Sequence, residues 1–274
     1  MPEFSAAIAV IGGSGLYRLF DPAESESRDV ATPYGPARVT VGQLAGKRVA
    51  FLTRHGTDHS VAPHLINYQA NIWALASIGV RAIVSSAAVG GVSADFPPGT
   101  LALPDQFIDR TWGRADTFFD RGSVQHLAAA DPFDPALHSL AAAAVGNEVT
   151  PSGTIVIIQG PRFSTRAESL WFGAAGAHLV NMTLYPEVPL ASELNIGTVN
   201  LSFVTDSDAG LAPAAGDPTG EEVSAELVFA RLADAQPRII AAIEAIVAAI
   251  PHDYSARELI PAAEVAAVLD RPTA

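Results

Sequence analysis

The stretch GTIVIIQGPRFSTRAESLWFGAAGA, residues 153–177, decides the fold class, because it passes from a strand pattern to a helix pattern through one short turn. Its first part is a β-branched apolar run, which is typical of a buried strand. Ser164, Thr165 and Glu168 then resemble a capping arrangement at the start of a helix. A strand followed by a helix is the repeating unit of α/β folds.

The same plan continues on both sides of this stretch. Residues 178–196, HLVNMTLYPEVPLASELNI, repeat it directly. Further strands are predicted over 6–11, 38–43, 47–54, 81–92, 99–110 and 197–210. Helices are predicted over 67–80, 134–146 and 221–250, the last with a possible break near Pro237. This alternation predicts an α/β fold with a central mixed β-sheet flanked by helices.

The chain shows no linker and no break in composition, so we expect a single domain over 1–274. The extent of the domain is less well defined over the tail after about residue 251. This tail is apolar enough to pack against another surface, such as that of a second subunit. The Ala/Gly/Pro stretch at 210–220 is expected to be a surface loop, and it contains an insertion at 211–219.

The composition excludes several classes of protein. Of the 274 residues, 49% are hydrophobic and 16% are charged, which is typical of a globular chain. The formal net charge of −13 argues against nucleic acid or anionic membrane as a partner. Any anionic ligand must therefore be held by a local group of donors, such as backbone N–H groups or one buried Arg.

The absence of cysteine rules out disulfides, thiolate metal sites and a catalytic thiol. The N-terminus lacks the pattern of a signal peptide, and no run of about 18 apolar residues suggests a membrane span. We therefore expect a cytoplasmic protein.

Gly12-Gly13-Ser14-Gly15 follow the first apolar run directly, and glycine-rich loops after strands often bind phosphate groups. A dinucleotide-binding loop would need a third glycine where Arg18 stands, and no Walker sequence follows. The segment is therefore either a tight turn or a loop that binds a small anion through backbone N–H groups and the Ser14 hydroxyl.

The segment TRHGTDH, residues 53–59, offers Arg54, whose planar guanidinium suits phosphate. His55, Asp58 and His59 are candidate metal ligands, although the segment is expected to be a loop rather than a helix with both imidazoles on one face. Anion binding, metal binding and a solvated loop all remain open on these residues alone.

Three further features are suited to a ligand. The small residues AAVGGV, 87–92, let backbone N–H groups approach a ligand closely, or simply form a turn. Phe163 can stack on a flat ligand or pack in the core. Asp206 and Asp208 are two apart at the end of a strand and should point to the same side. If the two carboxyl groups are buried, their pKa is raised and one of them can serve as a general acid. The alternative is that both lie in a solvated acidic loop.

Taken together, these segments resemble the 5′-methylthioadenosine phosphorylase group of the trimeric purine nucleoside phosphorylase family. The matching stretches, between residues 8 and 210, are IGGSG, TPYG, RHG, NYQANIWAL, DQFIDRT, IQGPRFSTRAES, VNMT and TDSDAG. The resemblance implies the nucleoside phosphorylase fold, a homotrimer, and phosphate-dependent cleavage of 5′-methylthioadenosine or a related 5′-substituted adenosine. The products would be adenine and the 5-substituted ribose 1-phosphate. Inorganic phosphate would be a co-substrate, with no cofactor and no metal.

The resemblance also implies roles for individual residues. Asp206 matches the acid that meets N7 of the base, and Asp208 matches the acid that accepts a hydrogen bond from the 6-amino group. The implied phosphate site consists of Ser14, Arg54, His55, Ala87, Ala88 and Thr183. The implied nucleoside site consists of Phe163, Ser164, Met182, Ala225, Val228, Phe229 and His126, the last supplied by a neighbouring subunit.

Two positions depart from the family pattern. Ala87 stands where Thr or Asn is frequent, which removes a donor that Ser86 could replace. Ala225 stands where a larger aliphatic residue is common, so the pocket for the 5′ substituent could be roomier. The identity of that substituent therefore stays open.

The two carboxylates suit a 6-aminopurine, because a buried carboxylate left unpaired against a 6-oxo group is costly. The alternatives are a purine nucleoside phosphorylase of broader or 6-oxopurine specificity, a metal-dependent hydrolase built on His55, Asp58 and His59, and a non-catalytic nucleoside-binding protein.

Overall fold

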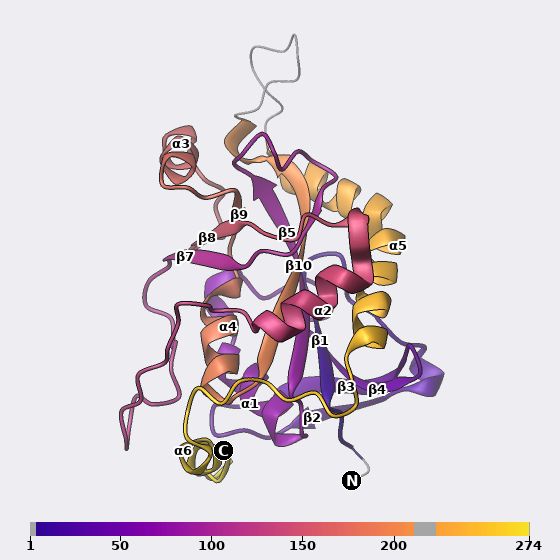
Figure 1. Ribbon diagram of the computed structural model, residues 1–274, viewed down its shortest axis with the longest axis vertical. Coiled ribbons are helices and arrows are strands. Elements are labelled where there is room, and N and C mark those ends of the chain that lie inside the picture. The colour runs from indigo at the N-terminus through magenta and orange to yellow at the C-terminus, as the bar shows by residue number, and fades with distance from the viewer. Residues whose placement is uncertain (1–3, 211–222, 274) are drawn as a thin grey trace.

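The computed structural model describes residues 4–210 and 223–273, and these residues form a ten-stranded sheet (Figure 1). The strands are β1 (Ile8–Gly12), β2 (Glu26–Val30), β3 (Ala37–Leu44), β4 (Lys47–Thr53), β5 (Ala82–Gly91), β6 (Leu101–Ala102), β7 (Gln106–Arg110), β8 (Thr154–Ile158), β9 (Leu179–Asn181) and β10 (Gly197–Ser207). The helices are α1 (Tyr68–Ser77), α2 (Pro135–Val145), α3 (Arg166–Ala174), α4 (Leu184–Glu193), α5 (Ala225–Ala249) and α6 (Ala262–Leu269).

The sheet is mixed, as the sequence predicted. Its order is β2-β3-β4-β1-β5-β9-β8-β7, and β10 pairs with β5 and β6. Strands β4, β1, β5 and β10 run parallel to their neighbours in this group, whereas β3 is antiparallel to β4 and β9 is antiparallel to β5. The carboxyl ends of the four parallel strands therefore lie at one edge, which is where ligands bind in open α/β sheets.

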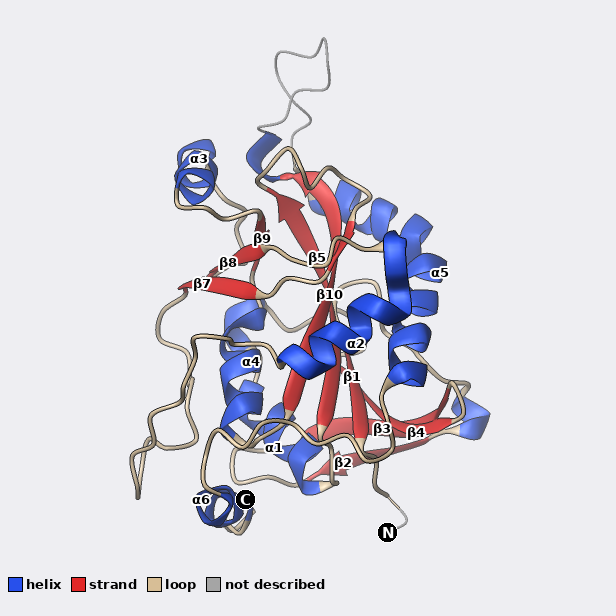
Figure 2. Ribbon diagram, in the orientation of Figure 1, coloured by secondary structure: helices blue, strands red, loops and turns tan. Residues whose placement is uncertain are grey.

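Helices cover both faces of the sheet (Figure 2), and β1 shows why. Its side chains alternate between the two faces. Ile8 and Val10 pack in the core that includes residues of α2 and α5, whereas Ala9 and Ile11 pack in the core that includes residues of α1 and α4. A strand buried on both faces reads as a continuous apolar run, which is what residues 6–11 show.

Two predicted elements differ from the structure. The strand expected over 99–110 is two strands, β6 and β7, separated by residues 103–105. Pro104 lies in this break, and proline has no N–H for a sheet ladder. In contrast, α5 continues through Pro237 without the predicted break. The predicted insertion at 211–219 lies outside the described residues.

The tail packs against its own chain, and we had not predicted α6. Trp73 on α1 donates its indole N–H to the carbonyl oxygen of Val268 at 3.1 Å, and the Val268 side chain is buried. Asn195, just after α4, donates its side-chain amide to the carbonyl oxygen of Ile260 at 2.7 Å. This tail therefore needs no second subunit to bury its apolar residues, although the single-domain organisation over 1–274 stays a prediction. No helix among the described residues is long and apolar enough to cross a bilayer.

Candidate active site

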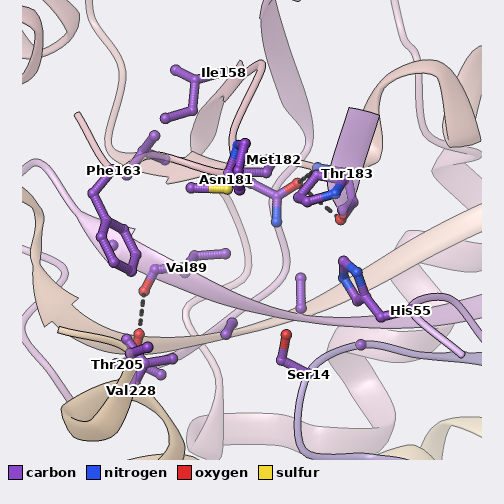
Figure 3. Close-up of a pocket in the computed structure, with 18 of the residues that line it drawn as sticks. Ser14, His55, Val89, Ile158, Phe163, Asn181, Met182, Thr183, Thr205 and Val228 are labelled. Carbon is purple, nitrogen blue, oxygen red and sulfur yellow. Dashed lines mark hydrogen bonds between the residues drawn. The ribbon is translucent and has the colours of Figure 1, made fainter. Parts of the chain in front are cut away.

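A cavity of about 390 Å³ lies at the carboxyl edge of the parallel strands, and it brings together nearly all the predicted site residues. Its lining includes Ser14, Arg54, His55, Ala87, Ala88, Phe163, Ser164, Met182, Thr183, Asp206, Asp208, Ala225, Val228 and Phe229. Figure 3 shows that Ser14, His55 and Thr183 lie at one end, and Phe163 and Val228 at the other. The volume is in the range of sites for small ligands.

The glycine loop after β1 is folded tightly against β5. The backbone N–H of Gly13 donates to the Ser86 hydroxyl at 3.1 Å. A Cβ atom at Gly13 would lie 2.4 Å from the Ser86 carbonyl oxygen, so this close approach requires glycine. Ser14, next in the chain, lines the cavity. The Ser86 hydroxyl accepts from Gly13, and Ser86 does not line this cavity, so its predicted replacement of the donor missing at Ala87 stays a prediction.

Arg54 is held by a carboxylate that the sequence reasoning did not single out. Its Nε lies 2.6 Å from Glu187 Oε2 and its Nη2 lies 2.8 Å from Glu187 Oε1, and the two side chains are 1% and 4% exposed. Its Nη1 donates to the Ser86 carbonyl oxygen at 2.9 Å. Arg54 has five N–H donors, so two remain for a ligand. The buried charge of Arg54 is therefore already matched before any anion binds.

His55 is buried beside Arg54 and is held in one tautomer. Its Nδ1 lies 2.8 Å from the carbonyl oxygen of Val61, which can only accept, so Nδ1 carries the proton. Burial, and then the charge of Arg54, lower the pKa of His55 to about 4. The neutral ring therefore keeps a lone pair on Nε2. Figure 3 shows the ring directed toward Thr183, on the same side of the pocket as the Ser14 hydroxyl.

Asn181 and Thr183 form the opposite side of this end. Asn181 Oδ1 accepts from the backbone N–H groups of Thr183 and Leu184, at 2.7 and 2.9 Å. It thereby satisfies two of the unpaired donors at the start of α4, and Thr183 makes no side-chain cap itself. In Figure 3 the amide nitrogen of Asn181 points into the pocket. The resemblance based on the stretch VNMT implies roles for Met182 and Thr183 but none for Asn181.

The other end of the cavity carries unpaired polar atoms. Thr165 is the N-cap of α3, in a capping box with Glu168, which confirms the predicted arrangement and leaves the Ser164 hydroxyl free of this task. Among the described residues, Ser164 Oγ and Asp208 Oδ2 are both buried with no hydrogen-bond partner. Burial raises the pKa of Asp208, and the neighbouring hydroxyls of Ser169 and Ser164 partly oppose this shift. Buried polar atoms without partners are uncommon and call for a ligand or water.

Asp206 and Asp208 both lie beside Gly90. A Cβ atom placed on Gly90 would lie 3.0 Å from Asp206 Oδ1 and 3.0 Å from Asp208 Cβ. The register of β10 against β5 shifts between Val204 and Asp206, and Asp208 begins a short 3-10 turn. The Thr205 hydroxyl contacts Asp206 Oδ2 at 2.6 Å. The pair is therefore a buried feature of the site and not the solvated acidic loop that the sequence left open.

The three residues that we weighed as metal ligands do not come together as a set. The rings of His55 and His59 are close, with centroids 4.8 Å apart, but Asp58 does not join them. His55 Nδ1 is occupied by Val61, the Asp58 carboxylate accepts from the Ser60 hydroxyl at 2.6 Å, and Asp58 does not line the cavity. The His59 ring instead packs edge-on against Phe229, with ring centroids 5.2 Å apart. Across residues 4–210 and 223–273, no group of three or more metal-ligating side chains comes together.

His126 is the predicted site residue that the structure does not bring to the cavity. It is exposed on the long loop between β7 and α2, and it does not line the pocket of its own chain. Its predicted contribution to a neighbouring subunit remains a prediction.

Comparison with known proteins places the chain in a family. Residues 7–248 match the model of the phosphorylase superfamily. The chain belongs to this superfamily. It is 49% identical to the S-methyl-5′-thioadenosine phosphorylase of Mycolicibacterium smegmatis, over 76% of this chain and 80% of the relative. It is 46% identical to the purine nucleoside phosphorylase of Streptomyces coelicolor, over 91% of each chain.

The fold has solved counterparts in the same family. The structure of methylthioadenosine phosphorylase from Schistosoma mansoni in complex with adenine superposes with a TM-score of 0.83 at 29% identity, covering 97% of this chain and 98% of that chain. The resemblance drawn from the sequence motifs and the expected nucleoside phosphorylase fold are both confirmed.

Proposed function

We propose that this protein catalyses the phosphate-dependent cleavage of 5′-methylthioadenosine, or of a closely related 5′-substituted adenosine. The products are adenine and the 5-substituted ribose 1-phosphate. The names of the relatives and of the superposed enzyme support this assignment.

One observation carries the proposal, namely the two buried polar atoms without partners at the Phe163 end of the cavity. Asp208 Oδ2 offers an acceptor and Ser164 Oγ offers a hydroxyl, and both residues line the cavity. A 6-aminopurine presents an N–H donor next to ring-nitrogen acceptors, so it can satisfy both atoms together. The Phe163 ring is then available to stack on the flat base.

The opposite end is suited to the nucleophile. The hydroxyls of Ser14 and Thr183 and the two remaining N–H donors of Arg54 can hold a phosphate below the sugar. A phosphate oxygen attacks C1′ as the bond to N9 breaks, and the bonding electrons pass to the base. A proton from Asp206 to N7 neutralises the charge that develops there, and the phosphate charge stabilises the cationic sugar. These steps call for no metal and no cofactor.

The 5′ substituent is assigned to the apolar side chains of α5. Ala225, Val228 and Phe229 line this part, and Phe229 is 37% exposed. We infer that the protein is a cytoplasmic homotrimer and that His126 of a neighbouring subunit covers this opening. In support, Val124, two residues before His126, is 71% exposed, as expected for an apolar residue that a partner buries.

The test is to measure base release from 5′-methylthioadenosine, adenosine and inosine, with and without inorganic phosphate. We expect strict dependence on phosphate and a kcat/KM for 5′-methylthioadenosine and adenosine that exceeds the value for inosine by up to about 10⁴-fold. Release without phosphate would contradict the proposal.

A second candidate is a purine nucleoside phosphorylase of broader base specificity. The observation that favours it is the Streptomyces coelicolor relative, which matches over 91% of each chain and is named for purine nucleosides in general. Equal rates for inosine and adenosine would establish this candidate in place of the first.

A further inference from the structure

We propose that Thr205 is a positioning residue for the acid Asp206, because its hydroxyl proton can turn toward the carboxyl group when that group gives up its own proton. The hydroxyl then stabilises the carboxylate that forms as the base departs. This inference rests on the proposed function, in which Asp206 protonates N7 of the base, and it adds a residue to which that proposal gives no role.

The first step is that the Thr205 hydroxyl lies within reach of two acceptors. Its Oγ1 is 3.2 Å from the carbonyl oxygen of Val89 on β5 and 2.6 Å from Asp206 Oδ2. Figure 3 shows the contact with Val89 as a dashed line. A hydroxyl has one proton, so it can donate fully to only one of these acceptors at a time.

The second step is that the charge of Asp206 decides which acceptor is preferred. While Asp206 is protonated, both acceptors are neutral oxygens. Once Asp206 has lost its proton, Oδ2 shares a negative charge, and charge-assisted hydrogen bonds are roughly twice as strong as neutral ones. The distance of 2.6 Å suits such a bond, whereas 3.2 Å to Val89 is long for a hydroxyl donor. The proton given to N7 is that of Asp206, and the Thr205 proton stays on Oγ1 throughout.

The third step is that the backbone of β10 is shaped to bring these two side chains together. Adjacent side chains of a regular strand point to opposite faces of the sheet. The register of β10 against β5 shifts between Val204 and Asp206, and such bulges redirect side chains. Arg231 on α5 holds the carbonyl oxygen of Thr205, with Nη1 at 2.5 Å. Thr205 and Asp206 both line the cavity and are 1% and 5% exposed, so water has little access to replace the hydroxyl.

Other charged groups act on the same acid and stay in place when Thr205 is changed. Asp208 lies in the turn that follows β10, and Glu168 on α3 acts on the charge of Asp208. Arg231 reaches the backbone of β10 from α5. Strands β5 and β9, which the structure describes in full, carry no titratable side chain. A change in pH dependence on replacing Thr205 therefore reports on its hydroxyl.

The test is the rate of adenine release from 5′-methylthioadenosine in single turnovers of the full chain, at saturating phosphate, as a function of pH. Single turnovers separate the chemical step from product release. The informative variant is Thr205→Val, which keeps the branched shape and removes the hydroxyl.

We expect two effects in this variant. A hydrogen bond to the charged form lowers the pKa of an acid, so its loss should raise the pKa of Asp206. The fall in rate on the alkaline side should therefore move up by about one pH unit, which is about a tenfold change in the acid dissociation constant. The rate at the plateau should fall by about 3- to 10-fold, because a weaker acid donates its proton less readily.

Thr205→Ser restores a hydroxyl and should keep the wild-type pH dependence. Thr198→Val is the matched control, because Thr198 lies on the same strand, is 3% exposed and does not line the cavity. This control should keep both the rate and its pH dependence. Should Thr205→Val not fold, Thr205→Ala also removes the hydroxyl and should show the same displacement of the alkaline fall.

A valine or alanine variant whose alkaline fall coincides with that of wild type would overturn the inference alone, even with a lower rate, since altered packing can lower a rate without moving the pH profile. The same displacement in Thr205→Ser would also overturn it. A wild-type chain that releases no adenine, or releases it without phosphate, would count against the proposed function instead.

Discussion

Replacing Glu187 by Gln tests the buried ion pair, and the structure allows its effect to be estimated. The pair is bidentate, with N–O distances of 2.6 and 2.8 Å, and both side chains are almost completely buried. Removing one partner of such a pair costs about 3–5 kcal/mol, because the other charge stays buried and unmatched. Glutamine keeps the volume and one acceptor, so we expect the lower end, about 3 kcal/mol. For a chain of this size that corresponds to a fall in Tm of about 6–12 °C.

The same substitution should strengthen phosphate binding. With Glu187 neutral, Arg54 offers an unmatched charge and freed N–H donors to an anion in the cavity, and charge-assisted hydrogen bonds are roughly twice as strong as neutral ones. Thermal melts with and without phosphate measure both effects. The rise in Tm on adding phosphate should be larger for Glu187→Gln than for wild type.

Glu193→Gln is the matched control, since Glu193 is also buried on α4. It accepts from the Thr117 hydroxyl and the Phe118 N–H, at 2.6 Å each, and forms no ion pair that the structure shows. This variant should lose about 1–2 kcal/mol and leave the response to phosphate unchanged. A Glu187→Gln protein that melts like wild type and responds to phosphate like wild type would refute the reasoning.

Two further predictions concern the reacting groups. Asp206→Asn should lower kcat by about 10²–10⁴-fold with little change in Tm. Steady-state kinetics on 5′-methylthioadenosine measure this effect. Unchanged turnover would favour a role for the chain outside catalysis. His55 should make the protein less stable in mild acid, because its pKa is about 4 when folded and near 6.5 when unfolded, so the unfolded chain binds the proton first as the pH falls. Denaturant titrations should show about 2 kcal/mol of this loss by about pH 5 in wild type and not in His55→Gln, and identical pH profiles would contradict it.

The sequence predicted those parts of the site that follow strands or cap helices. Short-range pattern places Ser14 after β1, Arg54 after β4 and Asp206 at the end of β10, and parallel strands bring these ends together. The capping box of Thr165 and Glu168 depends on residues three apart, so it too was predictable. In each case the deciding interaction is local or follows from the common direction of the strands.

The partners of these residues could not be predicted in the same way. Glu187 is 133 positions from Arg54, and nothing local shows that its carboxylate is buried. A signal did exist, since a glutamate in the apolar sequence LYPEVPL is rarely buried without a partner. Asn181 is a similar case, because it caps α4 from a position outside the helix. The predicted contribution of His126 involves a second chain, so no interaction within one chain indicates it.

The charges around the cavity explain how a chain with a net charge of −13 can hold an anion at all. The sequence suggested backbone N–H groups or one buried Arg, and the structure contains the Arg with its charge already matched by Glu187. In the proposed site, phosphate would be held by directed donors such as the hydroxyls of Ser14 and Thr183 and the two remaining N–H groups of Arg54. This arrangement suits the proposed reaction. Because no unmatched cation neutralises the phosphate, its negative charge can stabilise the positive charge that develops on the ribose as the base departs.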